Sequence, residues 1–484
     1  MAAKKKDKNA VNRSKGGVRT GQSPGPSRTA EKQSEPAYDV GKGKLRTSVT
    51  AIDQHRNHKQ GPQRQAQQQV QPSGRRPQVK PDRNRQAQAM AAAAPAPQAA
   101  AKAAPRVHRY YDFYLLIAVL AIFTIGLLMV YSSSQYTAMM DGQPHDYYFK
   151  RQLIIGGAGF FAILVCSLMS GLVIRALRVL AVPALAVTTF LTLLTLLVGA
   201  SSHGATRWLR IGGVSIQTAE IAKVAIIMFM AAMVDRKGFA IGRFRKNWRI
   251  LLYVGIPSIL ITMENLSSGI IMFGICFVMY FVGSKNWKLF VFVGIAGIVA
   301  LIVAKPLTAY IVEMRGIVNI EEVNYRLRRI LAWACPEQFP DDAYQTLQGL
   351  YAIGSGGLTG QGLGESIQKF GALPEAQNDM IFSIICEELG FVGAFLVVTV
   401  YLFIIFRLYD IARYAKDLFS SMLCVGVMAH ISIQVILNIA VVTGFIPNTG
   451  VTLPFISYGG SAVLCTLGEI GIALAVSHEI LTDS

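Results

Sequence analysis

Apolar runs separated by short polar breaks recur along the chain from Phe113 onward. Each run is close to the ~20 residues that a helix needs to cross the hydrocarbon core of a bilayer. The pattern predicts ten transmembrane helices at about 113–132, 153–173, 177–199, 218–234, 249–264, 267–283, 287–306, 380–406, 418–444 and 457–477. The sequence therefore predicts an all-α polytopic membrane protein over residues 111–484.

The first 110 residues follow a different pattern, rich in Gln, Pro, Ala and Gly with few aromatic or branched apolar side chains. They carry 23 Lys and Arg against 6 Asp and Glu, a net charge of +17. Such a segment buries too little apolar surface to offset the loss of chain entropy, so residues 1–110 are predicted to be a disordered basic tail. Attraction to anionic lipid headgroups, or a solubilising role, is favoured over nucleic-acid binding because the tail lacks interleaved aromatic residues and a folded reading module.

The distribution of basic residues predicts the orientation in the membrane, because short loops rich in Lys and Arg stay cytoplasmic. Alternate loops contain Arg175, Arg178, Arg236, Lys237, Arg243, Arg245, Lys246, Lys285, Lys288, Arg407, Arg413 and Lys416. The first thirty residues lack the apolar core of a signal peptide. Both termini are therefore expected in the cytoplasm, and the long polar segment at about 305–379, between helices 7 and 8, is expected to be extracellular.

The stretch LPEAQNDMIF, Leu373–Phe382, places Glu375 and Asp379 directly before the eighth predicted span. An acid at the mouth of a span can be partly desolvated, which suits it to act as a general base. The alternative is that Asp379 is only the N-cap of the helix, bound to backbone amides of the first turn. From the residues alone both interpretations stay open.

Two further segments between spans could bind an anion. The stretch AIGSGGLTGQGLGES, Ala352–Ser366, holds six glycines and could cradle a phosphate, with Lys369 nearby; the alternative is a flexible external loop, since no Walker motif follows. The stretch HGATRWLRIGGVSIQTAEIAK contains Arg207, then Glu220 and Lys223 on one helix face. Those two side chains form either an internal ion pair or part of a cationic pocket for a pyrophosphate.

The stretch GFIPNTGVTLPFISYGGSA, Gly444–Ala462, interrupts the apolar pattern with prolines and glycines. Irregular backbone at membrane depth survives only where protein or water satisfies it, so a re-entrant loop that lines a cavity is predicted. Gln434 and Asn438 on the preceding span are expected to form interhelical hydrogen bonds. A transporter and an enzyme that acts on a lipid-linked substrate both fit these features. The enzyme is favoured because the unusual residues gather at one face and no internal repeat is visible.

The stretches YQTLQGLYAIGSGGLTGQGLG, LPEAQNDMIFSIICEELGFVGA and PNTGVTLPFISYGGSA closely resemble the SEDS family of bacterial cell-wall polymerases, and the likeness runs from about Phe113 to Ser477. The cell-division branch looks nearest. The resemblance implies an inverting peptidoglycan glycosyltransferase that polymerises lipid II beside a class B penicillin-binding transpeptidase and other division proteins. Its expected place is the plasma membrane at the division septum. An elongation or sporulation relative, or a lipid II flippase, is the alternative.

The resemblance also implies roles for individual residues. Asp379 matches the acid presumed to be catalytic in this family, the base that deprotonates the acceptor 4-hydroxyl while undecaprenyl pyrophosphate leaves. We assign neutralisation of the leaving group to Arg207, Lys223 and Lys369, and the resemblance supports the Glu220 and Lys223 positions specifically. Glu375, Ser457 and Ser461 are also expected to bind substrate. Glu375 either orients its loop or binds a divalent cation, Mg or Mn. No other cofactor is expected, because the six cysteines show no zinc or disulfide spacing.

The chain departs from the family pattern at two places. The run Gln217–Glu220 lacks a proline that the family often has at the helix start, which bears on the geometry of that turn. Asn265 stands where the family often has an acid, so no catalytic role is assigned to it. Its neighbour Glu264 is interpreted either as a solvated helix end or as part of a site.

Overall fold

The computed structural model describes residues 107–483 apart from 199, 203–204, 212–213, 243, 285–286 and 316–323. Residues 1–106 of the predicted tail lie outside the described residues. Next to that tail, β1 (Val107–Arg109) pairs antiparallel with β5 (Leu481–Asp483). The backbone N–H of Tyr110 also donates to the carbonyl of Ile480 at 3.0 Å.

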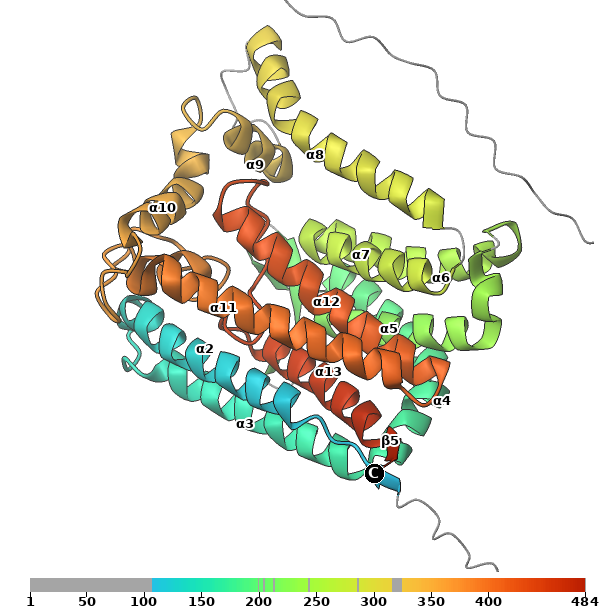
Figure 1. The fold of residues 1–484 in the computed structure, drawn as a ribbon. Helices are drawn as coiled ribbons and strands as arrows, with labels where there is room; N and C mark the ends of the chain where they lie inside the picture. The colour runs from blue at the N-terminus through green and yellow to red at the C-terminus, as the bar shows by residue number, and fades with distance from the viewer. Residues whose placement is uncertain are drawn as a thin grey trace, which may run out of the picture. The chain divides into compact units, whose positions relative to one another are not determined.

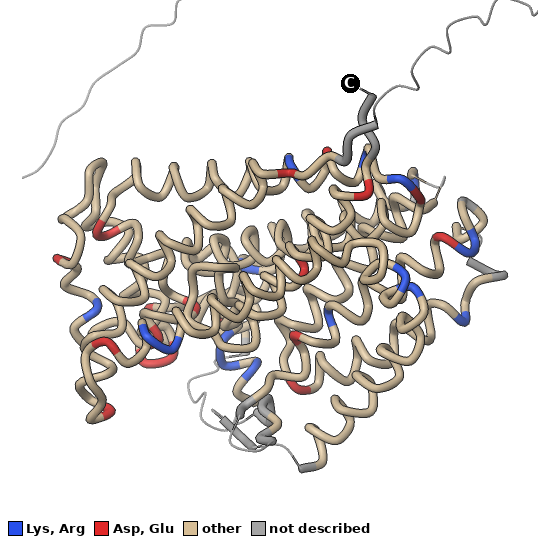
Figure 2. Tube along the Cα trace, turned by 90° about the horizontal axis from the view of Figure 1, so that it is seen from below, with Lys and Arg blue, Asp and Glu red and all other residues tan. Residues whose placement is uncertain are grey.

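A helix stands at each of the ten predicted spans in the described part of the chain. They are α2 (Phe113–Met140), α3 (Tyr147–Leu168), α4 (Ser170–Val198), α5 (Thr218–Lys237), α6 (Phe244–Glu264), α7 (Leu266–Val282), α8 (Trp287–Arg315), α11 (Ile381–Tyr414), α12 (Leu418–Val442) and α13 (Gly460–His478). Seven of them are long and apolar enough to cross a membrane, whereas α7 has 17 residues and both α5 and α6 carry charged side chains within their length. Charged residues are sparse along the helices (Figure 2). The chain is thus an all-α multi-pass membrane protein.

The helices pack in antiparallel and crossing pairs around α5, α12 and α13 (Figure 1). The helix α3 packs along α13, while α11 contacts both α2 and α12. More than 60% of the apolar window is buried in both α12 and α13, against 6% in α8. The helix α8 therefore lies at the edge of the bundle, where its apolar side chains can face lipid.

The segment between α8 and α11 contains regular structure that the sequence pattern did not predict. The helix α8 continues past residue 306 to Arg315, and two helices follow, α9 (Tyr325–Ala334) and α10 (Pro340–Gly356). Pro at the first position and two acids in the first turn favour the start of α10. The predicted loop 305–379 is therefore not a structureless connector, since α8, α9 and α10 share a small apolar core made of Val312, Leu331, Ala332, Phe339 and Ala343.

A second unpredicted element precedes α5. Three short strands, β2 (Ala200–Ser202), β3 (Ala205–Ile211) and β4 (Val214–Gln217), form an antiparallel sheet. Alternation over so few residues gives a weak strand signal, which the longer apolar runs on both sides obscure. The sheet leads directly into the first turn of α5. The sequence could not predict the geometry of this turn, because Gln217–Glu220 lacks the proline that the family often has there.

An ion pair connects the start of α2 to α11. Asp112 is fully buried and accepts the N–H of Leu115 at 2.9 Å, which caps α2. The Arg407 guanidinium donates to the same carboxylate at 2.8 Å and to the hydroxyl of Tyr110 at 2.5 Å. Burial and the Asp112 carboxylate raise the pKa of Tyr110, so that this hydroxyl stays protonated and neutral near pH 7.

Candidate functional site

Asp379 lies in the run of turns that joins α10 to α11, and only 8% of it is exposed. The N-cap of α11 is Met380 and the helix begins at Ile381, so the interpretation of Asp379 as the N-cap residue is wrong. Its backbone carbonyl accepts a hydrogen bond from Asn438 Nδ2 on α12 at 2.8 Å. The prediction that Asn438 bonds to another helix is wrong, because its amide donates to the turn before α11 and to Val451 in the loop after α12. Gln434 does form the predicted interhelical bond, with Lys223 on α5.

The irregular segment between α12 and α13 covers the turn that carries Asp379. Ser457 Oγ donates to the carbonyl of Asn378 and accepts the N–H of Leu453, both at 2.7 Å. The N–H of Tyr458 donates to the carbonyl of Gln377 at 2.9 Å. Protein groups thus satisfy irregular backbone in this segment, as the predicted re-entrant loop requires.

Gly450 of this segment lies close to the Asp379 side chain. Its φ is +69°, and a Cβ built on it would lie 3.6 Å from Asp379 Oδ2. Glycine adopts this backbone conformation without steric cost and leaves the space beside the carboxylate open. The sequence showed a Gly in a Pro- and Gly-rich stretch but gave no sign of which carboxylate it would face.

Two residues that the sequence did not single out tie α9 and α10 to the same place. Gln345 on α10 accepts from Asn448 Nδ2 at 2.7 Å and donates to the carbonyl of Pro374 at 3.2 Å. Arg329 on α9 donates to the carbonyl of Asn448 at 3.2 Å. Gln345 lies within one of the quoted motifs, but the periodic pattern could not reveal that its amide bridges the two segments around Asp379.

Glu220 and Lys223 form the ion pair that their spacing allowed. Lys223 Nζ lies 2.9 Å from Glu220 Oε2, and the two side chains are 1% and 6% exposed. The same ammonium donates to Gln434 Oε1 on α12 at 3.2 Å. The ion-pair interpretation is therefore confirmed, while a substrate contact of either residue stays a prediction.

Lys369 is also buried and paired. Its Nζ lies 3.0 Å from Glu388 Oε1 on α11, and it donates to Ser132 Oγ at 3.0 Å and to the carbonyl of Gly364 at 2.5 Å. Only 4% of Lys369 is exposed. This geometry gives Lys369 a structural partner, so that any contact with a substrate anion would have to compete with Glu388.

The glycine-rich segment after α10 is packed against a break in α11. Gly390 has φ +67° and ψ −168° inside α11, and a Cβ on Gly360 would lie 2.2 Å from the carbonyl oxygen of Glu388. The backbone N–H groups of Gln361 and Gly362 donate to the carbonyls of Glu387 and Glu388 at 2.9 and 3.0 Å. The glycines permit this close approach, so the segment is packed against α11. That it is flexible, as its glycine content suggested, stays a prediction.

Glu387 holds the next part of the same segment. Its carboxylate accepts from Ser366 Oγ at 2.5 Å and from the backbone N–H groups of Ile367 and Gln368 at 3.0 and 3.3 Å. Charge-assisted bonds of this kind are among the stronger ones inside proteins. The two buried acids of α11 therefore anchor the glycine-rich segment.

The remaining predicted residues are spread around this site. Glu375 is exposed, has φ +57° and accepts from Asn378 Nδ2. Ser461 Oγ accepts the N–H of Gln217 at 3.4 Å. Arg207 lies in β3, and its side chain lies outside the described residues. In the described part of the chain no three His, Cys, Asp or Glu side chains gather closely enough to hold a metal ion.

The two departures from the family pattern have structural consequences. Glu264 is 3% exposed, so the interpretation of it as a solvated helix end is wrong. Asn265 is the N-cap of α7, and its side chain accepts the N–H of Ser267 at 3.1 Å. An amide caps a helix as well as a carboxylate does. Ser267 Oγ in turn donates to the carbonyl of Thr449, beside Gly450.

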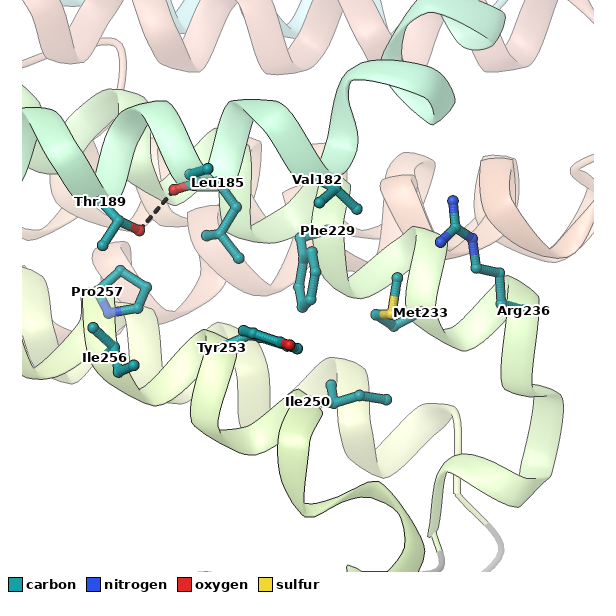
Figure 3. Close-up of a pocket in the computed structure, with 11 residues that line it drawn as sticks. Val182, Leu185, Thr189, Phe229, Met233, Arg236, Ile250, Tyr253, Ile256 and Pro257 are labelled. Carbon is teal, nitrogen blue, oxygen red and sulfur yellow. Dashed lines mark hydrogen bonds between the residues drawn. The ribbon is translucent and has the colours of Figure 1, made fainter.

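An apolar cavity of about 540 Å³ lies between α4, α5 and α6 (Figure 3). Leu185, Phe229, Tyr253 and Pro257 contribute to its walls, with Arg236 at one end. Its lining contains no residue that the sequence predicted to contact substrate. The candidate site is therefore the polar region around Asp379.

Known proteins share both the sequence and the fold. The family model for the FtsW, RodA and SpoVE cell cycle proteins matches residues 113–481. Stage V sporulation protein E of Bacillus subtilis is 38% identical, and the match covers 76% of this chain and 97% of that protein. The probable peptidoglycan glycosyltransferase FtsW of Geobacter metallireducens is 36% identical over 76% of this chain and 95% of its own length.

Solved structures give the same result for the fold. A structure from work on polymerisation and crosslinking by a peptidoglycan synthase complex has a TM-score of 0.60 at 24% identity, covering 76% of this chain and 98% of that one. The rod shape determining protein RodA of Thermus thermophilus has a TM-score of 0.54 at 24% identity, covering 76% of this chain and 97% of its own. The chain therefore belongs to the SEDS family of FtsW, RodA and SpoVE proteins.

Proposed function

We propose that this protein is an inverting peptidoglycan glycosyltransferase that polymerises lipid II, with Asp379 as its general base. Relatives at 35% and 36% identity bear the name probable peptidoglycan glycosyltransferase. The observation that carries the proposal is the arrangement around Asp379. Asp379 is only 8% exposed, Asn438 donates to its backbone carbonyl, and its carboxylate lies beside Gly450, which has no side chain to fill that space.

The chemistry requires one base and compensation of negative charge. The 4-hydroxyl of the acceptor sugar gives its proton to Asp379, from ~3 Å away, as its oxygen attacks the anomeric carbon of the donor. The bond from that carbon to the pyrophosphate oxygen breaks, undecaprenyl pyrophosphate leaves, and the configuration inverts. Cationic groups then stabilise the charge that grows on the leaving group. Arg207 is proposed for that role. Lys223 and Lys369 are both buried and paired, so each contributes only if it exchanges its carboxylate partner, Glu220 or Glu388, for the substrate.

A divalent cation has a weaker basis. Glu375 is the proposed ligand for Mg or Mn, but its carboxylate accepts from Asn378, and the described residues offer no set of three acidic, His or Cys donors. Magnesium is often held by one or two carboxylates together with substrate phosphates, so a single proposed ligand such as Glu375 is compatible with an ion, and no step above is routed through it. Glu375, Ser457 and Ser461 are proposed to shape the substrate loop.

The proposed orientation of the protein in the membrane rests on the distribution of Lys and Arg among its loops. Ten spans with both termini in the cytoplasm would place Asp379 on the outer side, away from basic residues such as Arg178, Arg236, Arg407 and Lys416. Lipid II and a class B transpeptidase are the proposed substrate and partner. Division at the septum is the proposed process, and sporulation is the second candidate because the SpoVE relative is 38% identical.

The test is polymerisation by the purified full-length protein together with its cognate transpeptidase. We expect the protein to convert purified lipid II into glycan strands longer than a disaccharide and to release undecaprenyl pyrophosphate. A muramidase should degrade these strands. A flippase would instead move lipid II across sealed vesicles and form no strands. Transport without polymerisation under these conditions would contradict the proposal.

A further inference from the structure

Five buried polar side chains connect α5, α12 and α13. Beyond the pair with Glu220, Lys223 Nζ donates to Gln434 Oε1, and that same oxygen lies 2.7 Å from His430 Nε2. His430 Nδ1 lies 2.7 Å from Glu469 Oε2. All five residues are buried. The proposed reaction uses neither His430 nor Glu469, and a buried ionisable pair is costly to keep where apolar packing would serve.

The partner of the Gln434 amide fixes its orientation. Gln434 Nε2 donates at 3.0 Å to the carbonyl oxygen of Thr452, which can only accept. The amide oxygen must therefore face Lys223 and His430. Because that oxygen also only accepts, His430 carries a proton on Nε2.

His430 Nδ1 and Glu469 Oε2 then share one further proton. It sits either on Nδ1, as an imidazolium beside a carboxylate, or on Glu469, as a carboxylic acid beside a neutral imidazole. The two side chains have zero net charge in both cases. The pair therefore adds no net charge beside Lys223 and Glu220, and it holds the Nε2–H towards Gln434.

Gln434 is the junction of this network. One end of its amide binds Lys223, and the other end binds Thr452 in the segment that covers Asp379. An ammonium has three rotatable donors and no fixed direction of its own, so its position depends on the acceptors around it. A rigid amide at this point sets the position of Lys223 relative to the loop.

We propose that the His430–Glu469 pair positions Lys223, acting through Gln434, and so keeps this cation in register with the loop over Asp379. The inference rests on the proposed function, in which Lys223 stabilises the pyrophosphate of the donor. His430, Gln434 and Glu469 are positioning residues in this account. The alternative is that they only hold helices together, as polar side chains in membranes often do.

Kinetics of lipid II polymerisation by the full-length protein with its transpeptidase separate these roles. His430→Leu removes the donor to Gln434. Because Lys223 acts on the charge that grows as the pyrophosphate leaves, we expect kcat for lipid II polymerisation to fall roughly ten-fold, the loss of one hydrogen bond to a charged network. His430→Gln keeps an N–H donor for Gln434 and should restore most of kcat. Thr192→Val is the control, because this buried hydroxyl bonds only within α4 and its loss should leave kcat unchanged. A native kcat in His430→Leu, or a low kcat that His430→Gln does not restore, would overturn the inference.

A second measurement does not depend on activity. Thermal unfolding midpoints are compared for Lys223→Met, His430→Leu and the double variant, once with Gln434 present and once with Gln434→Leu. We expect non-additive shifts with Gln434 and additive shifts without it, because the amide carries the coupling. Additive shifts in both backgrounds would contradict the inference. If His430→Leu does not fold, Glu469→Gln replaces it in the same comparison. If the native protein does not polymerise lipid II, that result counts against the proposed function and leaves this inference about the network untouched.

Discussion

Asn438 on α12 holds Asp379 by its backbone: the amide nitrogen of Asn438 donates to the carbonyl oxygen of Asp379 at 2.8 Å and also to that of Val451 at 2.7 Å. A single amide thus joins the turn before α11 to the loop that covers it. Because both acceptors are backbone carbonyls in a buried region, the two hydrogen bonds fix the position of the Asp379 backbone, from which its carboxylate extends.

Asn438→Ala should therefore lower both stability and polymerisation. Two buried carbonyls lose their donor, which costs about 1–3 kcal/mol of unfolding free energy for an unsatisfied group. We expect polymerisation of lipid II to fall at least ten-fold. Asn247→Ala is the matched control, because Asn247 likewise donates to two backbone carbonyls, those of Ala240 and Ile241. Equal loss of activity in both variants would mean that stability alone explains the effect.

Gly450→Ala tests the space beside the carboxylate. The added Cβ would lie 3.6 Å from Asp379 Oδ2 on a backbone with φ +69°. We expect the rate of polymerisation to fall by an order of magnitude or more. Gly142→Ala is the control, because Gly142 has φ +66° and nothing within 4 Å of the added atom. Both variants share the backbone strain of about 1–2 kcal/mol, and native activity in Gly450→Ala would show that this space is not used.

Gly360→Ala tests whether the glycine-rich segment is anchored. The new Cβ would meet the backbone of Glu388 at 2.2 Å, which no side-chain movement can relieve. We expect a lower thermal midpoint and faster proteolysis between residues 356 and 370. Gly364→Ala has a similar φ of +87° with open space around the added atom, so it should be much milder. Similar proteolysis in both variants would favour a loop without fixed contacts.

Lys369→Met and Glu388→Gln distinguish a structural lysine from one that binds substrate. Removing one partner of a buried pair leaves an uncompensated charge and costs about 3–5 kcal/mol. Combining the two changes removes both charges, so the thermal midpoint should largely recover. If Lys369 has only a structural role, the double variant should recover polymerisation together with its thermal midpoint. An inactive double variant with a native midpoint would assign Lys369 to the substrate.

The sequence predicted the helices well because their signal is local: a run of about twenty apolar residues implies a span by itself. It did not predict α9, α10 or the β2–β4 sheet, whose short segments have weak periodicity between long apolar runs. In the site, the quoted motifs indicated Asp379 and the pairing of Glu220 with Lys223. Partners such as Gln345 and Glu469 could not be predicted, because the contacts depend on packing between elements far apart in the chain.

The central claim is that Asp379 is the base for glycan polymerisation. The most direct test compares the native protein with Asp379→Asn, both purified with the cognate transpeptidase and supplied with lipid II. The amide is nearly isosteric but cannot take the hydroxyl proton, so we predict native folding and partner binding with polymerisation reduced by at least 10²-fold. Glu365→Gln, a matched change at an exposed acid of the same segment between α10 and α11, should retain full activity. Polymerisation by Asp379→Asn at the native rate would contradict the account.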